Sequence, residues 1–293
     1  MTARDDRIEE AYAACEELTR RHYENFSIAS VLLPGDVRRH MYALYAYARG
    51  VDDLGDEAPG DRLLRLGWWE QHLMATWSRC RPPEGERPAA FVALGQTRRE
   101  LDLPIEPFRR LIEANRRDQW VNRYSTFDQV LEYCTFSADP VGRLVLMIFG
   151  YRETDLWPLS DATCTALQLT NFWQDVARDY AMDRIYLPAE DRERFGVSED
   201  DLGRCEATPE LRRLIAFEIG RTRELFDRGR PLIDRVAGRF RIDLDLFTRG
   251  GEAILDAIEA RDCDILAERP VLSRGRRVIL FAAAVAGRFR RRS

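Results

Sequence analysis

The chain has 293 residues, 45% of them hydrophobic and 32% charged, a balance typical of a folded protein with a substantial core. Its formal net charge is −5, so there is no overall basic field that would indicate nucleic acid as a partner. All 45 basic residues are arginine, so any basic side chain that faces a phosphate must be a guanidinium.

Apolar residues recur at three- and four-residue spacing through most of the chain, and alternating strand-like runs are missing. Proline and glycine interrupt this pattern, and the connections that they mark are short, as between antiparallel helices. We therefore predict one all-α domain over residues 1–293, with helices at residues 9–23, 37–51, 62–77, 89–101, 108–120, 127–149, 161–181, 210–236, 244–260 and 275–289.

Cysteine usage and the hydropathy of the chain favour a cytoplasmic protein. The six cysteines are scattered, without a Cys-x-x-Cys pair or a histidine at ligand spacing, which argues against a zinc site and a disulfide framework. Residues 1–10 are polar and acidic, unlike a signal peptide. The longest apolar run, residues 278–287, has about half of the ~20 residues that a membrane-spanning helix needs.

A first acidic cluster follows the apolar helix expected over residues 37–51, and it comprises Asp52, Asp53, Asp56 and Glu57. On a helix, Asp52 shares a face with Asp56, and Asp53 shares one with Glu57. Like charges at this spacing repel, and burial adds a desolvation cost, so a cation should lie beside them. Carboxylate oxygens suit Mg²⁺. The alternative is a solvated acidic helix end, which the helix macrodipole disfavours at a C-terminus.

A second cluster lies on the helix expected over residues 161–181. Asn171, Asp175 and Asp179 are spaced four residues apart, and Gln168 precedes them by one turn, so oxygen-bearing side chains follow one helix face. The other faces are apolar. This row indicates a metal site, and its alternative is a satisfied buried Asn171 with surface aspartates.

Two such helices in one bundle would line a cavity with carboxylates, which bridge Mg²⁺ ions to a polyanion such as a diphosphate leaving group. A di-iron bundle would need Glu-x-x-His pairs, and none is present. The three histidines form no ligand pattern, so Mg²⁺ is favoured over a redox metal.

The chain resembles the squalene/phytoene synthase family of head-to-head prenyl synthases. The resemblance combines two acid motifs in the right order with an Arg-x-Tyr-Leu-Pro tail. It implies an all-α isoprenoid synthase fold with a central cavity, a Mg²⁺ cofactor of two or three ions, and a prenyl diphosphate substrate. The segments that carry it are residues 23–26, 33–34, 45–57, 137–144, 168–179 and 184–188.

Carried over position by position, the resemblance implies roles for individual residues. The catalytic set would be Asp52, Asp56, Asp175, Asp179 and Tyr45, which lines the site. The metal ligands would be Asp52, Asp56, Glu57, Asn171, Asp175 and Asp179. Substrate contacts would come from Tyr23, Asn25, Arg49, Asp53, Gln168, Asn171, Arg184 and Tyr186.

Four positions depart from the family pattern. Many relatives have serine at the positions of Tyr23 and Asn25, many have a basic residue at that of Gln174, and glycine is usual at that of Asp183. These departures bring the diphosphate contacts of the first condensation into question. The variants at residues 23–26 and 137–142 resemble the branch of the family from bacterial hopanoid biosynthesis, which implies that presqualene diphosphate ionises, rearranges and captures water to give hydroxysqualene.

Two other functions stay open. A squalene, dehydrosqualene or phytoene synthase would condense two identical allylic diphosphates, and a reducing synthase would also bind NADPH. The absence of a glycine-rich dinucleotide motif does not decide this, because reductases of the family lack one too. A non-catalytic scaffold relative would typically have lost the acid ligands, and both sets are intact here.

The C-terminal segment supports two interpretations. Arginines at 274, 276 and 277 precede an apolar stretch, and arginines at 288 and 290–292 follow it. Such a segment forms either the last core helix with a solvated basic tail, or a peripheral contact with an anionic membrane that receives the product.

Overall fold

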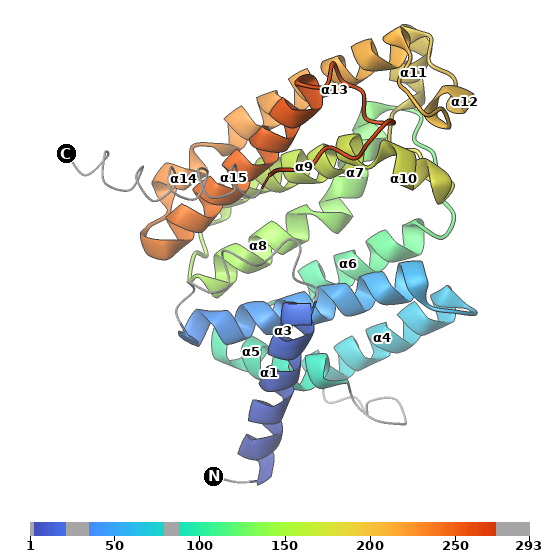
Figure 1. Ribbon diagram of the computed structural model, residues 1–293. Coiled ribbons are helices and arrows are strands. Elements are labelled where there is room, and N and C mark those ends of the chain that lie inside the picture. Colours follow the sequence, from blue (N-terminus) through green and yellow to red (C-terminus); the bar gives the residue numbers. More distant parts are fainter. Residues whose placement is uncertain (1–2, 22–34, 79–87, 274–293) are drawn as a thin grey trace, which may run out of the picture. The chain divides into compact units, whose positions relative to one another are not determined.

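The computed structural model describes residues 3–21, 35–78 and 88–273 (Figure 1). The prediction of an all-α fold is confirmed, because every regular element in these ranges is a helix. The extended pairing found there is an isolated parallel bridge between Arg123 and Ile185. None of the described helices combines the length and the apolar character that crossing a membrane requires.

The chain divides into two compact units, Met1–Trp120 with Pro140–Arg152, and Val121–Asp139 with Glu153–Ser293. In the first unit, α3 packs against α1, α5 and α6, and α4 packs against α5 and α6. The helices are α1 (Ala3–Arg21), α3 (Gly35–Asp52), the π-helical turn η1 (Asp53–Glu57), α4 (Arg62–Trp77), α5 (Ala89–Leu101), α6 (Glu106–Arg117) and α8 (Asp139–Ile148), whose first residue belongs to the second unit.

The core of the first unit is built around Tyr47 of α3, which is fully buried. Its ring lies 5.2 Å from that of Phe108, 5.8 Å from that of Phe91 and 5.9 Å from that of Trp69, so α6, α5 and α4 all contact it. Its hydroxyl donates to the carbonyl of Phe108 at 2.9 Å, which satisfies the buried polar atom. This packing fixes α3, which ends at Asp52 and leads into the η1 turn that carries the rest of the first acidic cluster.

In the second unit, α9 is the central helix and packs against α13, α15 and α7. Trp173 of α9 is fully buried, and its indole N–H donates to the Thr222 hydroxyl of α13 at 2.8 Å. The helices are α7 (Phe127–Ser137), η2 (Thr154–Leu156), α9 (Trp157–Gln174), α10 (Val176–Ala181), α11 (Ala189–Phe195), α12 (Glu199–Leu202), α13 (Pro209–Gly229), α14 (Leu232–Arg235) and α15 (Gly238–Glu259).

Three of the predicted helices are interrupted. The helix predicted over residues 127–149 is broken between α7 and α8, and Pro140 explains the break, because proline lacks an N–H and clashes with the preceding turn. Pro231 separates α13 from α14 in the same way. The third break falls at Asp175, inside the second acidic cluster. The short helices α11 and α12 were not predicted, and the helix predicted over 275–289 lies outside the described residues.

Candidate active site

The first acidic cluster lies on a π-helical turn rather than on an ordinary α-helix end. The N–H of Ala58 donates to the carbonyl of Asp53, five residues earlier, at 2.9 Å. The wider turn changes the angular spacing that an α-helix would give to Asp52 and Asp56. Single π turns are rare and occur frequently at functional sites, which agrees with the role predicted for this segment.

Helix α6 holds this turn in place. A Cβ added to Gly55 would lie 2.1 Å from the Asn115 side-chain oxygen, so only glycine allows α6 to approach so closely. The Asn115 amide donates to Oδ1 of Asp52 at 3.2 Å, and the Gln119 amide donates to the Gly55 carbonyl at 3.0 Å. The Asp52 carboxylate is therefore oriented by a neutral donor and keeps its negative charge available for a cation.

The charges of the cluster are distributed unequally. Nε of Arg49 lies 2.7 Å from Asp53, and its Nη2 lies 3.1 Å from Glu57, so one guanidinium serves two of the four acids. Protein atoms that displace water raise the pKa of Asp52 to about 6, although part of its side chain stays exposed, and the nearby Asp56 carboxylate adds to this effect. Glu57, predicted as a metal ligand, and Arg49, predicted as a diphosphate contact, thus pair with each other here.

Tyr45 lies one turn before Arg49 on α3 and is partly buried. Burial raises the pKa of its phenol, against the opposing effect of Arg49, and Asp52 and Asp53 raise it further. The hydroxyl therefore stays protonated near neutral pH and can act as a hydrogen-bond donor beside the first cluster.

The second cluster spans the junction of α9 and α10. Asp175 leaves helical geometry there, with φ −108° and ψ 14°. The Asp175 N–H nevertheless donates to the Asn171 carbonyl at 2.9 Å, and the Asp179 N–H donates to the Asp175 carbonyl at 2.8 Å. These are helical i→i−4 bonds, so the predicted spacing of one turn between successive side chains persists through the break. Gln168 lies on α9 one turn earlier, as predicted.

A guanidinium that the sequence did not point to pairs with this cluster. Arg269 follows α15, and its Nη2 lies 3.0 Å from Oδ2 of Asp175, while its Nε contacts Oδ1. Gln174 is buried, accepts from Arg269 at 3.3 Å and donates to the carbonyl of Pro270. Gln174 therefore fastens this segment to α9, and Arg269 supplies the positive charge that a basic residue at position 174 would have given.

Asp179, Arg184 and Tyr186 border one small pocket, so the structure brings three of the predicted residues together. The Tyr186 ring stacks on that of Phe172, with centroids 3.7 Å apart and an angle of 5° between the planes. The Arg184 N–H donates to the Asp179 carbonyl at 2.8 Å, which ties the start of the 184–188 segment to α10. A carboxylate, a guanidinium and a phenol thus meet beside an apolar wall.

The donors of both clusters fit Mg²⁺. All are carboxylate or amide oxygens, and the guanidinium of Arg269 on Asp175 demonstrates that this carboxylate accepts a cation. Among the described residues, no three His, Cys, Asp or Glu side chains form a ready-made ligand group. Mg²⁺ commonly binds through one or two carboxylates and completes its octahedron with water and substrate phosphates. The two clusters belong to different units, so their opposition across a cavity stays a prediction.

Some predicted residues lie outside the described ranges, and some contributors were missed. Tyr23 and Asn25 lie outside the described residues. Asn115, Gln119 and Arg269 contact the clusters and were not predicted. Asn115 had a detectable signal, since it is a polar residue on the apolar face of α6, next to Leu111 and Ile112. Arg269 is one of 45 arginine residues and had none.

Comparison with known proteins identifies the family. Residues 19–276 match the family model described as Squalene/phytoene synthase. The chain is 34% identical over 270 residues to the hydroxysqualene synthase of Zymomonas mobilis, a match that covers 90% of this chain and 88% of the relative.

Solved structures agree with this match. Squalene synthase HpnC from Alicyclobacillus acidocaldarius is 47% identical, with a TM-score of 0.81, and the match covers 87% of this chain and 95% of that one. A dehydrosqualene synthase in complex with ligand is 24% identical and shares the fold, with a TM-score of 0.86 and coverage of 97% and 98%. The predicted isoprenoid synthase fold is confirmed, and enzymes of this family act on diphosphate substrates with divalent metal ions. The chain belongs to the squalene/phytoene synthase family.

Proposed function

We propose that this protein is a Mg²⁺-dependent hydroxysqualene synthase, which converts presqualene diphosphate to hydroxysqualene and diphosphate in squalene and hopanoid biosynthesis. The observation that carries this proposal is the 34% identity to the Zymomonas hydroxysqualene synthase along 90% of the chain. Both acid clusters are intact, which favours catalysis over a scaffold role. The family match runs through both compact units, which supports their action as one domain over residues 1–293.

The oxygen ligands divide between the two clusters, with Asp52 and Asp56 in the first and Asn171, Asp175 and Asp179 in the second. When bound there, two or three Mg²⁺ ions would offset the charge that grows on the diphosphate as its carbon–oxygen bond breaks. Asn115 would keep the Asp52 carboxylate in one orientation through its 3.2 Å hydrogen bond. Preorganised ligands of this kind lose little entropy when the substrate arrives.

Arg184 and Tyr186 would bind and orient the leaving diphosphate, because both border the pocket of Asp179. A guanidinium presents two parallel N–H donors to phosphate oxygens, and a phenol adds a third. Gln168 would contact the substrate or an intermediate near the reacting carbons. The stacked rings of Phe172 and Tyr186 would keep water from this side of the diphosphate.

The proposed reaction balances without a redox partner. The carbon–oxygen bond of the cyclopropylcarbinyl diphosphate breaks, and the leaving diphosphate keeps the electron pair. The cation rearranges to the 1,1′-linked skeleton, and a water oxygen then bonds to the cationic carbon. That water releases one proton to solvent, and the product is an allylic alcohol, secondary or tertiary according to which end of the allylic cation binds the water, with no net change in oxidation state.

Incubation of the purified protein with presqualene diphosphate and Mg²⁺ in H₂¹⁸O, without NADPH, tests the proposal. We expect hydroxysqualene that carries one ¹⁸O atom, together with one equivalent of diphosphate. Asp175→Asn keeps the shape of the side chain but removes its charge, so it serves as the matched inactive control. Absence of product, or an alcohol without ¹⁸O, contradicts the proposal.

The second candidate is condensation of two allylic diphosphates, and the name of the 47% identical Alicyclobacillus protein, squalene synthase, favours it. Farnesyl diphosphate supplied as the sole substrate, with and without NADPH, separates the two functions. Squalene, dehydrosqualene or hydroxysqualene made from farnesyl diphosphate alone would establish that the chain also carries out the first half-reaction. Full cellular activity of Asp52→Ala would instead revive the scaffold function.

We further infer a cytoplasmic enzyme that contacts the membrane peripherally through its basic C-terminal segment, residues 274–293, which lie outside the described residues. The charge pattern of this segment and the apolar character of a C30 product support the inference. Co-sedimentation with anionic vesicles at low and high salt tests it. Removal of residues 288–293 should abolish the salt-sensitive fraction, and unchanged sedimentation contradicts it.

A further inference from the structure

Asp183 adopts a backbone conformation that is uncommon for residues other than glycine. Its φ is +60°, in the left-handed region, where the Cβ atom of any residue other than glycine crowds the backbone and costs free energy. The residue lies directly before Arg184, at the point where the chain leaves α10. A strained residue at this position needs contacts that hold it, and they determine how the following residues are presented.

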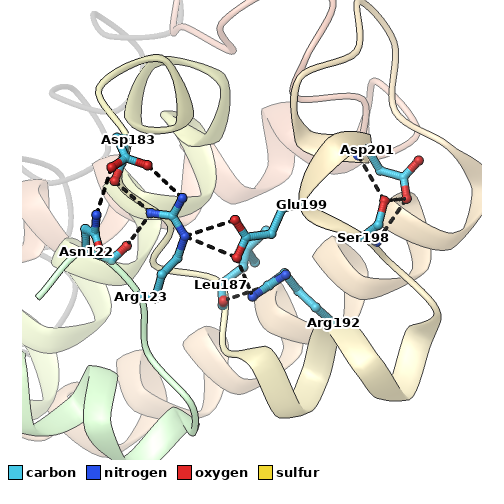
Figure 2. Close-up of polar contacts among 8 residues, drawn as sticks. All are labelled: Asn122, Arg123, Asp183, Leu187, Arg192, Ser198, Glu199 and Asp201. Carbon is cyan, nitrogen blue, oxygen red and sulfur yellow. Dashed lines mark hydrogen bonds and ion pairs between the residues drawn. The ribbon is translucent and has the colours of Figure 1, made fainter.

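Arg123 supplies most of these contacts, and Figure 2 shows its guanidinium between Asp183 and Glu199. Nη2 donates to Oδ1 of Asp183 at 2.8 Å, and Nη1 donates to the Asp183 carbonyl at 2.7 Å. Asn122 donates to the other carboxylate oxygen at 2.9 Å. Side chain and backbone of Asp183 are therefore both fixed from the 122–123 segment.

Arg123 is itself anchored on its opposite edge. Its Nε lies 3.1 Å from both carboxylate oxygens of Glu199, the first residue of α12. The Glu199 carboxylate also accepts a hydrogen bond from Arg192 at 3.3 Å. A capping box between Ser198 and Asp201 fixes the start of α12, as Figure 2 also shows. The guanidinium thus bridges Asp183 and α12 with a fork of donors, which a lysine ammonium does not reproduce.

The segment after Asp183 is bonded along the same line. The Ile185 N–H donates to the Asn122 carbonyl at 2.9 Å, and the Ala189 N–H donates to the Tyr124 carbonyl at 2.9 Å. The Arg184 N–H donates to the Asp179 carbonyl on the other side. The backbone of Arg184 is therefore enclosed between α10 and the 122–124 segment.

We propose that Arg123 and Asp183 are positioning residues that preset Arg184 beside Asp179 for binding of the substrate diphosphate, an inference that rests on the proposed function. Neither residue needs to touch the substrate. Their network keeps the 183–186 segment in one conformation, so that Arg184 loses little freedom when it binds a phosphate group.

Calorimetric titration of inorganic pyrophosphate in the presence of Mg²⁺ tests this directly, without turnover. We expect Arg123→Ala to weaken pyrophosphate binding roughly tenfold, as removal of supporting contacts around a binding site typically does. Arg123→Lys should weaken it almost as much, because one ammonium cannot make the three-sided contact. Arg235→Ala is the matched control. Arg235 lies outside this network and pairs with the exposed Asp155, with 2.7 Å between Nη2 and Oδ2. The pyrophosphate affinity of this variant should equal that of the wild type.

Substitution of Asp183 separates the side chain from backbone strain. Asp183→Gly relieves the strain but removes the carboxylate, so the variant should fold as stably as the wild type and still bind pyrophosphate more weakly. Asp183→Asn keeps an acceptor for Arg123 and tolerates the left-handed conformation, so it should restore most of the affinity. Wild-type affinity in Asp183→Gly overturns the proposal, and so does an Asn variant no better than the Gly variant.

A double substitution tests whether Arg123 acts through Arg184. Arg184→Ala alone should weaken pyrophosphate binding, and Arg123→Ala added to it should cost less than about twofold more, because coupled residues are non-additive. Independent, multiplicative losses overturn the inference. An Arg184→Ala variant with wild-type affinity overturns both this inference and the diphosphate role of Arg184. The proposed reaction itself is decided separately, by the ¹⁸O product of the wild-type protein.

Discussion

Asp52, a proposed metal ligand, is oriented by a neutral neighbour. Asn115 donates to it at 3.2 Å, and Asn115→Leu removes this donor while it keeps a similar side-chain volume. We expect the Mg²⁺ concentration for half-maximal activity to rise roughly tenfold, because supporting hydrogen bonds to ligands typically contribute this much.

The matched control for this prediction is Gln96→Leu on α5. It also deletes an amide that donates to a carboxylate, Glu100, at 2.6 Å, but away from the acidic cluster. Its Mg²⁺ requirement should stay that of the wild type. An Asn115→Leu variant with an unchanged requirement, or a Gln96→Leu variant with an equal rise, would sink the proposed role of Asn115.

If Asp175 binds a metal ion as proposed, Arg269 would compete with it, since the two cannot share the same carboxylate oxygens at full strength. Arg269→Ala should therefore strengthen the binding of Mg²⁺ alone roughly twofold to fivefold, the range expected for a partly exposed ion pair. Calorimetric titration of Mg²⁺ without substrate measures this affinity. Arg261→Ala, which removes a similar pair with Glu268 at 3.0 Å, should leave Mg²⁺ affinity unchanged. Weaker metal binding in Arg269→Ala contradicts the competition.

At this scale the sequence marked the candidate ligands but not the groups that contact them. Asp52 and Asp175 were predictable as candidate ligands, because acids at helical spacing on apolar helices need a cation. Arg123 and Arg269 were not, because their contacts join segments about 60 and 94 residues apart, and no local pattern marks one arginine among many. The Glu57–Arg49 ion pair was not predicted, because the resemblance had assigned separate roles to Glu57 and Arg49.

The π-helical turn η1 is an element whose form depends on a single glycine. In Gly55→Ala the new Cβ would lie 2.1 Å from the Asn115 oxygen, so α6 or the turn must shift. We expect a loss of about 1–3 kcal/mol in the free energy of unfolding, the usual cost of overpacking, together with reduced activity. Urea denaturation measures the first effect.

Gly67 on α4 provides the control for this substitution. A Cβ there meets nothing within 4 Å, so Gly67→Ala should be neutral or stabilise the protein by up to about 1 kcal/mol through helix propensity. If both variants lose the same stability, close packing of η1 against α6 is not the cause.

Helix existence was predictable along most of the chain, whereas helix interruption was only partly so. In the described residues, apolar periodicity marked the longer helices correctly because each of these helices buries one face, as the buried side chains of Tyr47 and Trp173 show in the two units. The breaks at Pro140 and Pro231 follow from proline chemistry and could have been drawn from the sequence. The break at Asp175 has no such local cause, and it coincides with the Arg269 contact from a distant segment.

For the molecule as a whole, charge burial links stability to pH. Glu218 of α13 is fully buried, and this burial raises its pKa to about 7 from an ordinary 4.5, against the opposing effect of Arg221 and with a further rise from Asp191. A carboxyl with a higher pKa in the folded state takes up a proton on folding. Its contribution to stability is thus fully present below pH 4.5 and is lost as the pH rises through 7.

Glu218→Gln isolates this contribution, because the amide is isosteric and stays neutral. Arg221 keeps its 2.6 Å pair with Asp191 in the variant, so no guanidinium is left alone. Relative to the wild type, the variant should gain up to about 3 kcal/mol between pH 4.5 and pH 7, which is the linkage expected for this shift. Urea denaturation at several pH values measures the difference.

Since Asp52 and Asp243 titrate near pH 6 in both proteins, their contributions cancel. Glu224→Gln, an exposed site on the same helix, should leave the pH profile unchanged, and a Glu218→Gln profile parallel to that of the wild type contradicts the prediction.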